Sequence, residues 1–430
     1  MIRLKYLGLA ILLIMPLQVF SEIHTNFDAE MSIEGKYFIS DSFLDQGNYF
    51  SSLRFDVDFY GDTGDSGIRY KFHPFVRYDS HDEERSKAQV NELFAEYTHL
   101  QIDYKVGIST VFWGVTESQH LIDIINQYDL AEHSEKEAKI GQPMASASAI
   151  YDWGAVDIFL LMGFVERTFA GEDGRPRSTI IVDTDEPIYV NGANKNTLDL
   201  GVRYYNTFGN LDFGLSYFGG VSRDPYFLLA YQGQIIENSI SVSQALISDL
   251  KLVPVYEDIQ QVSIDALYLL NDWAWKLEGY RRFGDNATYY AAVFGFEYTS
   301  VGIMDSRIDA GWILEYNYDQ RKDSAPFITF QNDFFFGARI NWNNQYGTNL
   351  VAGVFWDPSL KEEVFKLEFR HRISDNIVIM SDTRVFISDT KLAGNTVYDY
   401  LKTLKEAGSN NSIAFIERDS YFQLELVFYF

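Results

Sequence analysis

Few residues in this sequence have a spacing that supports catalysis. The seven histidines show no paired metal-binding pattern such as H-E-x-x-H, and the chain has no cysteine for a disulfide or a thiolate metal site. His81 and Asp82 are the one adjacent pair that could belong to a hydrolase at the rim of a fold, with its other partners on distant segments. The acidic stretches at 172–173 and 183–186 lack EF-hand spacing, so solvated loops are favoured there over calcium sites. We therefore expect no metal and no cofactor, and keep a hydrolase as one alternative.

Basic residues on the polar side of alternating segments could act on a solute instead. A row of cations lining a water-filled passage would attract small anions by focusing the electric field. The alternative is that neighbouring acids such as Glu368, Asp382 and Glu425 neutralise these cations, which would then only maintain the shape of the wall. The candidate selectivity residues are Arg339, Lys366, Arg370, Arg372 and Arg384.

The stretch 113–143 is the most distinctive part of the chain. Its apolar residues Leu121, Ile122, Ile124 and Ile125 suggest a short helix with one apolar patch. We predict that this stretch folds inward and narrows a passage; a helix on the outer surface is the alternative. The candidate constriction residues are Trp113, His120, Asp123, Asn126 and Asp129.

The composition limits the elements that can position these residues. The chain has 430 residues, of which 22% are charged and 16% aromatic, so disorder and a coiled coil are poor fits. Its 61 acidic and 35 basic residues give a net charge of -26, which argues against a nucleic-acid partner because phosphate binding needs a basic face. No stretch is long and apolar enough for a transmembrane helix, since a spanning helix needs about 18 such residues. A large sheet remains as the scaffold.

The C-terminal segment 421–430 alternates strictly between two faces. One face carries Phe422, Leu424, Leu426, Phe428 and Phe430, and the other carries Gln423 and Glu425. This segment resembles the last strand of bacterial outer-membrane β-barrels, whose terminal Phe is read by the barrel-assembly machinery. An amphipathic edge strand of a soluble sandwich is the alternative. In addition, Trp113-Gly114 followed by Ile122-Asp123-Ile124-Ile125-Asn126 is similar to a pattern in porin-like proteins of proteobacteria, and more loosely to alginate-export barrels.

Alternation with period two recurs in about eighteen segments, an even number as single-chain bacterial barrels require. One of these segments is 261–270, and the loop after the strand at 377–388 contains helical spacing over 396–407. The long connections at 114–143, 166–196, 220–260 and 389–419 all fall on the same side, opposite the short turns. We therefore predict an all-β fold, a transmembrane antiparallel up-and-down barrel over residues 22–430.

The N-terminal residues predict the destination of the chain. Arg3 and Lys5 precede an apolar run and a small-residue step before Glu22, which is typical of a secretory signal peptide over 1–21. We expect a barrel in the Gram-negative outer membrane whose partners are outer-membrane lipid, the assembly machinery and small solutes, and favour a monomer over a trimer. A passive channel for small polar or anionic solutes is the leading hypothesis. A plugged barrel of an export or envelope-trafficking system is the first alternative.

Overall fold

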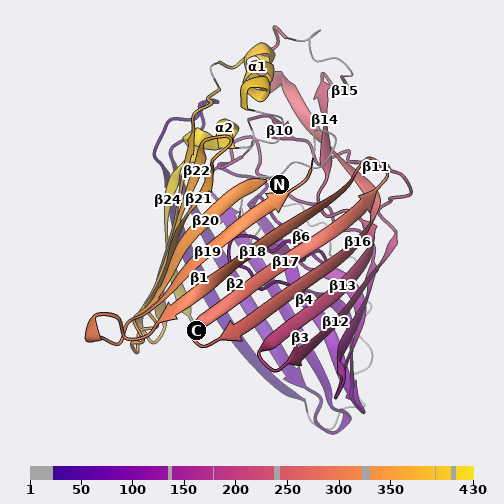
Figure 1. Cartoon of the computed structure of the whole chain (residues 1–430). Helices are drawn as coiled ribbons and strands as arrows, with labels where there is room; N and C mark the ends of the chain where they lie inside the picture. The colour runs from indigo at the N-terminus through magenta and orange to yellow at the C-terminus, as the bar shows by residue number, and fades with distance from the viewer. Residues whose placement is uncertain are drawn as a thin grey trace.

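The computed structural model describes residues 23–133, 138–177, 179–236, 243–321, 330–392, 394–407 and 413–430, so the expected signal peptide lies outside the described residues. Eighteen antiparallel strands form a closed barrel, which confirms the predicted fold class (Figure 1). Each barrel strand pairs with the next, and β24 pairs with β1. The barrel strands are β1 (His24–Phe38), β2 (Tyr49–Asp62), β3 (Ile68–Asp79), β4 (Lys87–His99), β5 (Ile102–Ser109), β8 (Gln142–Tyr151), β9 (Gly154–Met162), β12 (Leu198–Phe208), β13 (Leu211–Val221), β16 (Leu250–Leu270), β17 (Trp273–Gly284), β18 (Thr288–Ser300), β19 (Asp309–Asp319), β20 (Asn332–Asn341), β21 (Asn349–Asp357), β22 (Glu362–Ser374), β23 (Ile377–Ser388) and β24 (Tyr421–Tyr429).

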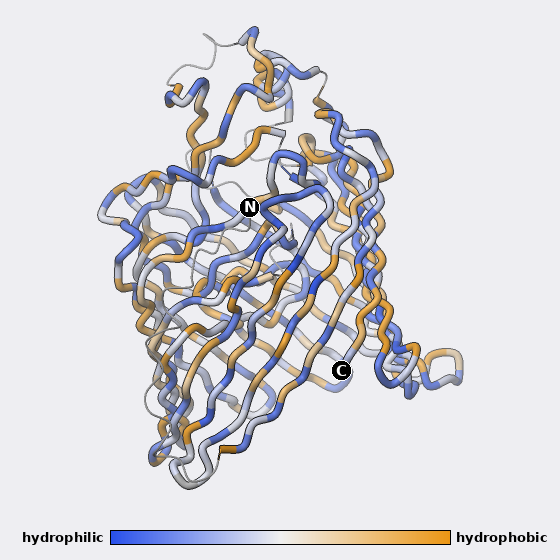
Figure 2. The backbone as a smooth tube through the Cα atoms, turned by 180° about the vertical axis from the view of Figure 1, so that it is seen from behind, coloured by the Kyte–Doolittle hydropathy of each residue, from blue (hydrophilic) through white to orange (hydrophobic). Residues whose placement is uncertain are grey.

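The two faces of the barrel wall have opposite chemistry. Apolar side chains such as Trp312 and Phe422 point outward and are 49% and 45% exposed, whereas Glu278 and Glu315 point inward and are fully buried. Figure 2 shows the same alternation of hydrophobic and hydrophilic residues along the strands. Closure pairs the backbone N–H and C=O groups between strands, as a wall in contact with hydrocarbon requires. The wall is therefore built to separate an apolar exterior from a polar lumen.

The connections divide the barrel into a turn side and a loop side. On the turn side the strands are joined by short turns such as 209–210, where Gly209 has the left-handed φ of 64° that glycine adopts without strain. On the loop side lie the long connections 110–141, 163–197, 222–249 and 389–420. This is the segregation of loop lengths that the sequence predicts.

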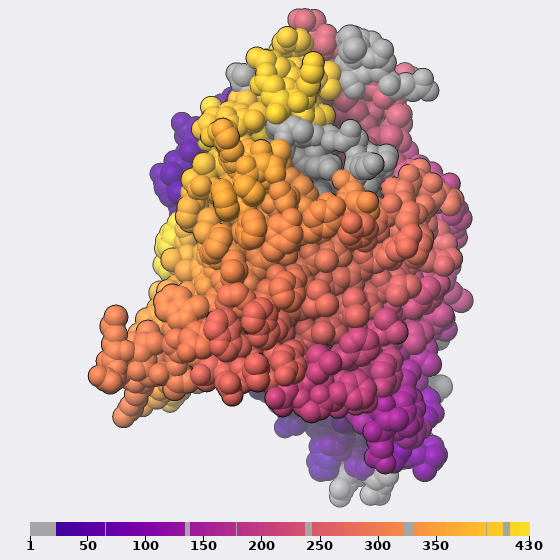
Figure 3. Space-filling view, in the orientation of Figure 1, coloured from indigo at the N-terminus to yellow at the C-terminus, as the bar shows by residue number. Residues whose placement is uncertain are grey.

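A small group of segments, here called the crown, stands on the loop side above the wall (Figure 3). It consists of residues 181–190, 226–235 and 397–407. β16 begins at Leu250 instead of near 261, so the predicted loop 220–260 is shorter than expected. The upper part of β16 pairs with β14 (Tyr226–Tyr231), β10 (Ile181–Val182) and β11 (Ile188–Val190) outside the barrel. The predicted helix is present as α1 (Val397–Ala407), with Thr396 and Asp399 capping its first turn.

Short elements complete the described part of the chain. They are β6 (Gln127–Tyr128), β7 (Lys139–Ile140), β15 (Gln234–Ile235), α2 (Ile413–Ile416) and the 3-10 turns η1 (Gly64–Ser66), η3 (Ile247–Asp249), η4 (Ile303–Asp305) and η5 (Glu417–Asp419). Within the described ranges, no helix is long and apolar enough to cross a membrane.

Candidate functional site: a lumen crossed by an inward loop

The connection 110–141, here called the inward loop, leaves β5 and returns to its neighbour β8, but its middle lies against the opposite side of the barrel. There the carboxylate of Glu278 in β17 accepts hydrogen bonds from the backbone N–H groups of Val115 and Thr116 at 2.6 and 3.0 Å. It also accepts the Thr116 hydroxyl at 2.7 Å and the Ile122 N–H at 3.3 Å. One buried wall carboxylate therefore fixes two separate points of the loop backbone.

Glu315 in β19 holds the next residues of the loop in the same way. Its Oε1 accepts the Glu117 N–H at 2.8 Å, and its Oε2 accepts the N–H and the hydroxyl of Ser118 at 2.7 and 2.6 Å. The Glu117 side chain in turn binds Arg339, a predicted selectivity residue. We call the inner face of β17–β19 the far wall; it holds the inward loop through hydrogen bonds that wall carboxylates accept.

The predicted constriction residues Trp113, Asp123 and Asn126 hold the loop to itself. Asn126 accepts the Val111 N–H at 2.8 Å, and its amide donates to the carbonyls of Ser109 and Ile140 at 2.9 and 3.0 Å, which ties the two legs of the loop together. Asp123 accepts the Trp113 N–H at 3.2 Å, and its carboxylate also pairs with a cation on the returning leg. That cation is Lys139, at 2.5 Å.

The predicted helix around residue 122 is absent. Residues 111–126 have irregular backbone, and Ile122, Ile124 and Ile125 are buried against apolar side chains of the inner wall instead of covering one face of a helix. Burying these side chains against the wall stabilises the inward position by removing apolar surface from water. The wall residues of this cluster are Met144, Phe159, Leu161, Phe218 and Ile259, and Trp113 joins them from the loop.

The returning leg of the loop binds the side of the barrel next to its origin. We call the inner face of β2–β4 the near wall. Asp129 pairs with Lys87 of β4 and accepts the Thr168 hydroxyl at 2.6 Å. Glu132 pairs through its Oε1 with Arg54 at 3.1 Å and with Arg77 at 2.7 Å. The loop supplies the carboxylates here, and the wall supplies the cations.

His120 is the constriction residue that is least enclosed. Its side chain is 37% exposed, lies edge-on to Phe112, and approaches the Glu278 carboxylate at 3.9 Å. This position places an imidazole at the surface of the loop that faces the far wall.

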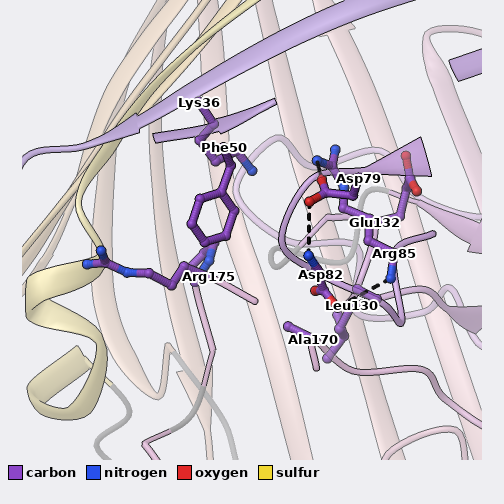
Figure 4. A pocket seen from close by; sticks show the side chains of 11 residues that line it. Lys36, Phe50, Asp79, Asp82, Arg85, Leu130, Glu132, Ala170 and Arg175 are labelled. Carbon is purple, nitrogen blue, oxygen red and sulfur yellow. Dashed lines mark hydrogen bonds and ion pairs between the residues drawn. The ribbon is translucent and has the colours of Figure 1, made fainter. Parts of the chain in front are cut away.

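A buried network of ions lies above the near wall, and Figure 4 shows two of its members, Asp79 and Arg85. Arg85 donates to both oxygens of Glu34, at 2.6 and 2.7 Å, and to Asp79 at 2.9 Å. Arg77 donates to Glu34 at 3.2 Å and to the Ser52 hydroxyl at 2.6 Å. Buried charges need such partners, because an unpaired buried charge is strongly unfavourable.

The predicted cationic stripe is mostly neutralised. Arg384 is fully buried and binds Asp382 and Glu368, the latter at 2.7 Å, and Lys366 binds the same Glu368 at 3.0 Å. By contrast, Arg370 and Arg372, nearer the turn side, have no ion-pair partner within the described ranges. Arg370 is half-buried and Arg372 is exposed.

A second segment, residues 163–177, crosses the mouth of the barrel on the loop side, and we call it the strap. Its Arg175 side chain is fully buried and donates to Asp419 at 2.8 Å and to the carbonyls of Ser40 and Gly47 at 3.1 and 3.2 Å. Its guanidinium also lies 4.2 Å from the centre of the Phe38 ring. The strap is therefore fastened near β1 and β24, well away from its own origin at β9.

The C-terminal residues close the barrel. β24 lies between β23 and β1, with Phe422 opposite Tyr37 and Leu424 opposite Gly35. The apolar face predicted from the sequence points outward, and its members are Phe422, Leu424, Leu426, Phe428 and Phe430.

The hydrolase candidate is not assembled as a catalytic triad in the described structure. The His81 ring accepts from or donates to Ser80 at 2.7 Å and stacks on Phe50, but the Asp82 carboxylate receives backbone N–H groups of Glu84 and Gly171. In the described ranges no group of three His, Cys, Asp or Glu side chains could hold a metal ion.

Sequence reasoning missed the partners of the inward loop. Glu278 and Glu315 are recognisable as inward-facing acids, but nothing local marks them as loop acceptors, and Glu132 stands in an unremarkable charged stretch. One usable signal was present: residues 158–162 are apolar on both faces, which indicates an inner wall covered by another segment.

No family model and no curated protein matches the chain. Similar solved structures include OmpT, an outer membrane protein of Vibrio cholerae in trimer form, with 11% identity, a TM-score of 0.44 and coverage of 95% of this chain and 99% of that chain. A tryptophan-substituted mutant of the Rh. blastica porin has 11% identity, a TM-score of 0.42 and coverage of 95% and 100%. A structure described as "Asymmetric conductivity of engineered proteins" has 12% identity, a TM-score of 0.41 and the same coverage. These similarities concern the barrel fold alone.

Proposed function

We propose that this chain forms a channel in the outer membrane of a Gram-negative bacterium and that the inward loop sets the bore for small polar solutes. The observation that carries the proposal is the crossing of a polar lumen by a loop tied to both the far wall and the near wall. A wall with an apolar exterior and charged interior is suited to a water-filled passage. A loop fixed across that passage limits the size of what can pass.

The selectivity of the channel would arise near the turn side. Arg339, Lys366 and Arg384 share their charge with neighbouring carboxylates, which reduces the field they produce in the lumen. The charges of Arg370 and Arg372 are less compensated by carboxylates, so we propose that a bias toward anionic solutes depends chiefly on these two residues.

Biogenesis follows the same proposal. The chain would be exported by the signal peptide over 1–21 and inserted by assembly machinery that recognises the C-terminal face ending at Phe430. Apolar residues lie on the outside of strands around the wall, which suits a monomer surrounded by lipid.

A barrel closed at the loop side, as in an export or envelope-trafficking component, is the second candidate. The observation that favours it is the strap, which Arg175 fastens across the mouth with a fully buried side chain.

Planar-bilayer recording of the folded protein, together with a variant lacking residues 115–140, tests both candidates. We expect ion conduction by the parent and a larger conductance for the deletion variant, because the loop no longer obstructs the lumen. Absence of current from both folded proteins would reject the channel. Equal conductance would show that the bore is set elsewhere, with the strap as the next segment to delete.

A further inference from the structure

Two cavities lie one above the other along the near wall. The lower cavity has a volume of about 210 Å³ and is lined by residues of β2–β4 and of the inward loop, among them Arg54, Phe75 and Gln89. The upper cavity, nearer the loop side, holds about 10 Å³, which is room for about one water molecule. Its lining includes Asp79, Ala170 and Arg175.

Among the residues that the structure describes, Glu132 alone lines both cavities. Its side chain is 9% exposed and stands between them, held by Arg54 and Arg77. Figure 4 shows it beside Asp79 and Arg85 on one side of the upper cavity, with Arg175 and Phe50 on the other. Removing this side chain would join the two spaces.

The attachment of Glu132 differs from that of the other buried acids around it. Both guanidinium groups bind the same oxygen, Oε1, while Oε2 is buried with no hydrogen-bond partner in the described part of the chain. Glu34, by comparison, receives two parallel hydrogen bonds from Arg85. A carboxylate with one orphaned oxygen is held less firmly than a bidentate one, because a buried acceptor without a donor is unfavourable.

The wall does not depend on Glu132 for its own charge balance. Without it, Arg54 keeps two hydrogen bonds to Asp56, at 2.6 and 2.7 Å, and Arg77 keeps Glu34 and Ser52. The side chain can therefore leave while the near wall stays intact. Its departure removes one negative charge from the path and frees guanidinium N–H groups.

From this geometry we infer that the path for solutes follows the near wall and that Glu132 is the gate residue that closes it. The inference rests on the proposed channel function and specifies where the passage runs and which side chain interrupts it. With Glu132 displaced, the path loses one negative charge beside Arg54 and Arg77, so it becomes more favourable to small anions than it is with Glu132 in place.

Cysteine accessibility tests this inference, because the chain has no cysteine of its own. Gln89→Cys places a thiol in the lower cavity and Ala170→Cys places one in the upper cavity. A membrane-impermeant thiol reagent is added from the turn side of the inserted barrel. We expect Gln89→Cys to react in the parent, and Ala170→Cys to react at least severalfold faster when combined with Glu132→Ala or Glu132→Gln.

The matched control is Glu425→Ala, which removes another inward-facing carboxylate, on β24. It should leave the reaction of Ala170→Cys unchanged. Bilayer recordings should also show a larger shift of the reversal potential toward anions for Glu132→Ala than for the control. Heat-modifiable electrophoretic mobility identifies folded barrels, and Glu132→Gln preserves the side-chain volume if the alanine variant does not fold.

The outcomes separate the two proposals. If Gln89→Cys is unreactive from the turn side, the lower lumen is closed and the channel function itself fails. If Gln89→Cys reacts but Ala170→Cys stays protected in both Glu132 variants, the channel stands and the assignment of Glu132 as its gate is overturned.

Discussion

The inward loop is bound to the two sides of the lumen with opposite polarity. On the far wall, Glu278 and Glu315 belong to the barrel and accept hydrogen bonds mainly from backbone N–H groups of the loop. On the near wall, Glu132 and Asp129 belong to the loop and bind cations of the barrel. Backbone donors require one particular loop conformation, whereas side-chain ion pairs can break and re-form by rotamer changes. The far wall thus shapes the loop, and the near wall is the side that can rearrange.

Breaking the far-wall attachment should have the largest effect. In Glu278→Ala combined with Glu315→Ala, several loop donors lose their acceptor, and each buried donor left unpaired costs about 1–3 kcal/mol. We expect the loop to leave its position while the barrel stays folded. Limited proteolysis within 115–122 and a rise in bilayer conductance measure this release.

The matched control for that experiment is Asp58→Asn, which alters an inward-facing carboxylate of β2 that the loop does not contact in the described structure. If the loop of the double variant resisted proteolysis as well as the loop of this control, the apolar cluster around Ile122 and Phe159 would be sufficient to hold it.

Weakening the loop from within should have an intermediate effect. Asn126→Ala removes three hydrogen bonds between the two legs and leaves the Val111 N–H without its acceptor, a loss of about 1–3 kcal/mol of local stability. Amide hydrogen exchange at Val111 should become faster, while exchange at Thr116, on the far wall, should change less. Equal acceleration at both sites would mean that the loop opens as one unit and that the two attachments are not independent.

Acidification, the mildest of these perturbations, should distinguish two carboxylates of the loop, Asp123 and Glu132. Burial raises the pKa of Asp123 despite the opposing effect of Lys139, so the folded state takes up this proton more readily than the unfolded chain and gains stability as the pH falls. Burial also acts to raise the pKa of Glu132, but Arg77 and Arg85 outweigh it, so the pKa of Glu132 is lowered from 4.5.

The ion pairs of Glu132 therefore stabilise the closed form above pH 4.5 and are lost only as the pH falls through its lowered pKa. Infrared titration of carboxyl protonation, with Asp123→Asn and Glu132→Gln to assign the signals, should show Asp123 protonating at the higher pH. The reverse order would contradict the stronger cationic environment of Glu132.

The barrel was predictable because its information is local. Phe422, Leu424 and their alternating neighbours specify the faces of β24 without knowledge of any partner, and the same pattern recurs along the chain. Prediction failed where a segment packs on both sides. β16 begins at Leu250, eleven residues before the predicted strand at 261. Its upper part leaves the alternating wall and pairs with β14, so Pro254 lies beside residues of the crown.

The candidate site was predictable only as a segment. The unusual stretch around Trp113 and Asp123 indicated the loop, but its helix was a wrong expectation, because the isoleucines pack into an irregular apolar cluster on the wall. The acceptors Glu278 and Glu315 lie more than 150 residues away along the chain, at separations of 163 and 198 residues from Val115 and Glu117. A contact of that kind depends on the closed fold and leaves no spacing in the sequence.

The pairing of β24 with β1 has a consequence for folding. Glu30 lies opposite Tyr429, so the seam joins the opposite ends of the described polypeptide. A contact of such high sequence separation forms late, because the loop-closure entropy must be overcome first. Until β24 pairs with β1, a partly assembled sheet has two open edges that can pair with other chains. These two edges therefore need protection for as long as the seam stays open.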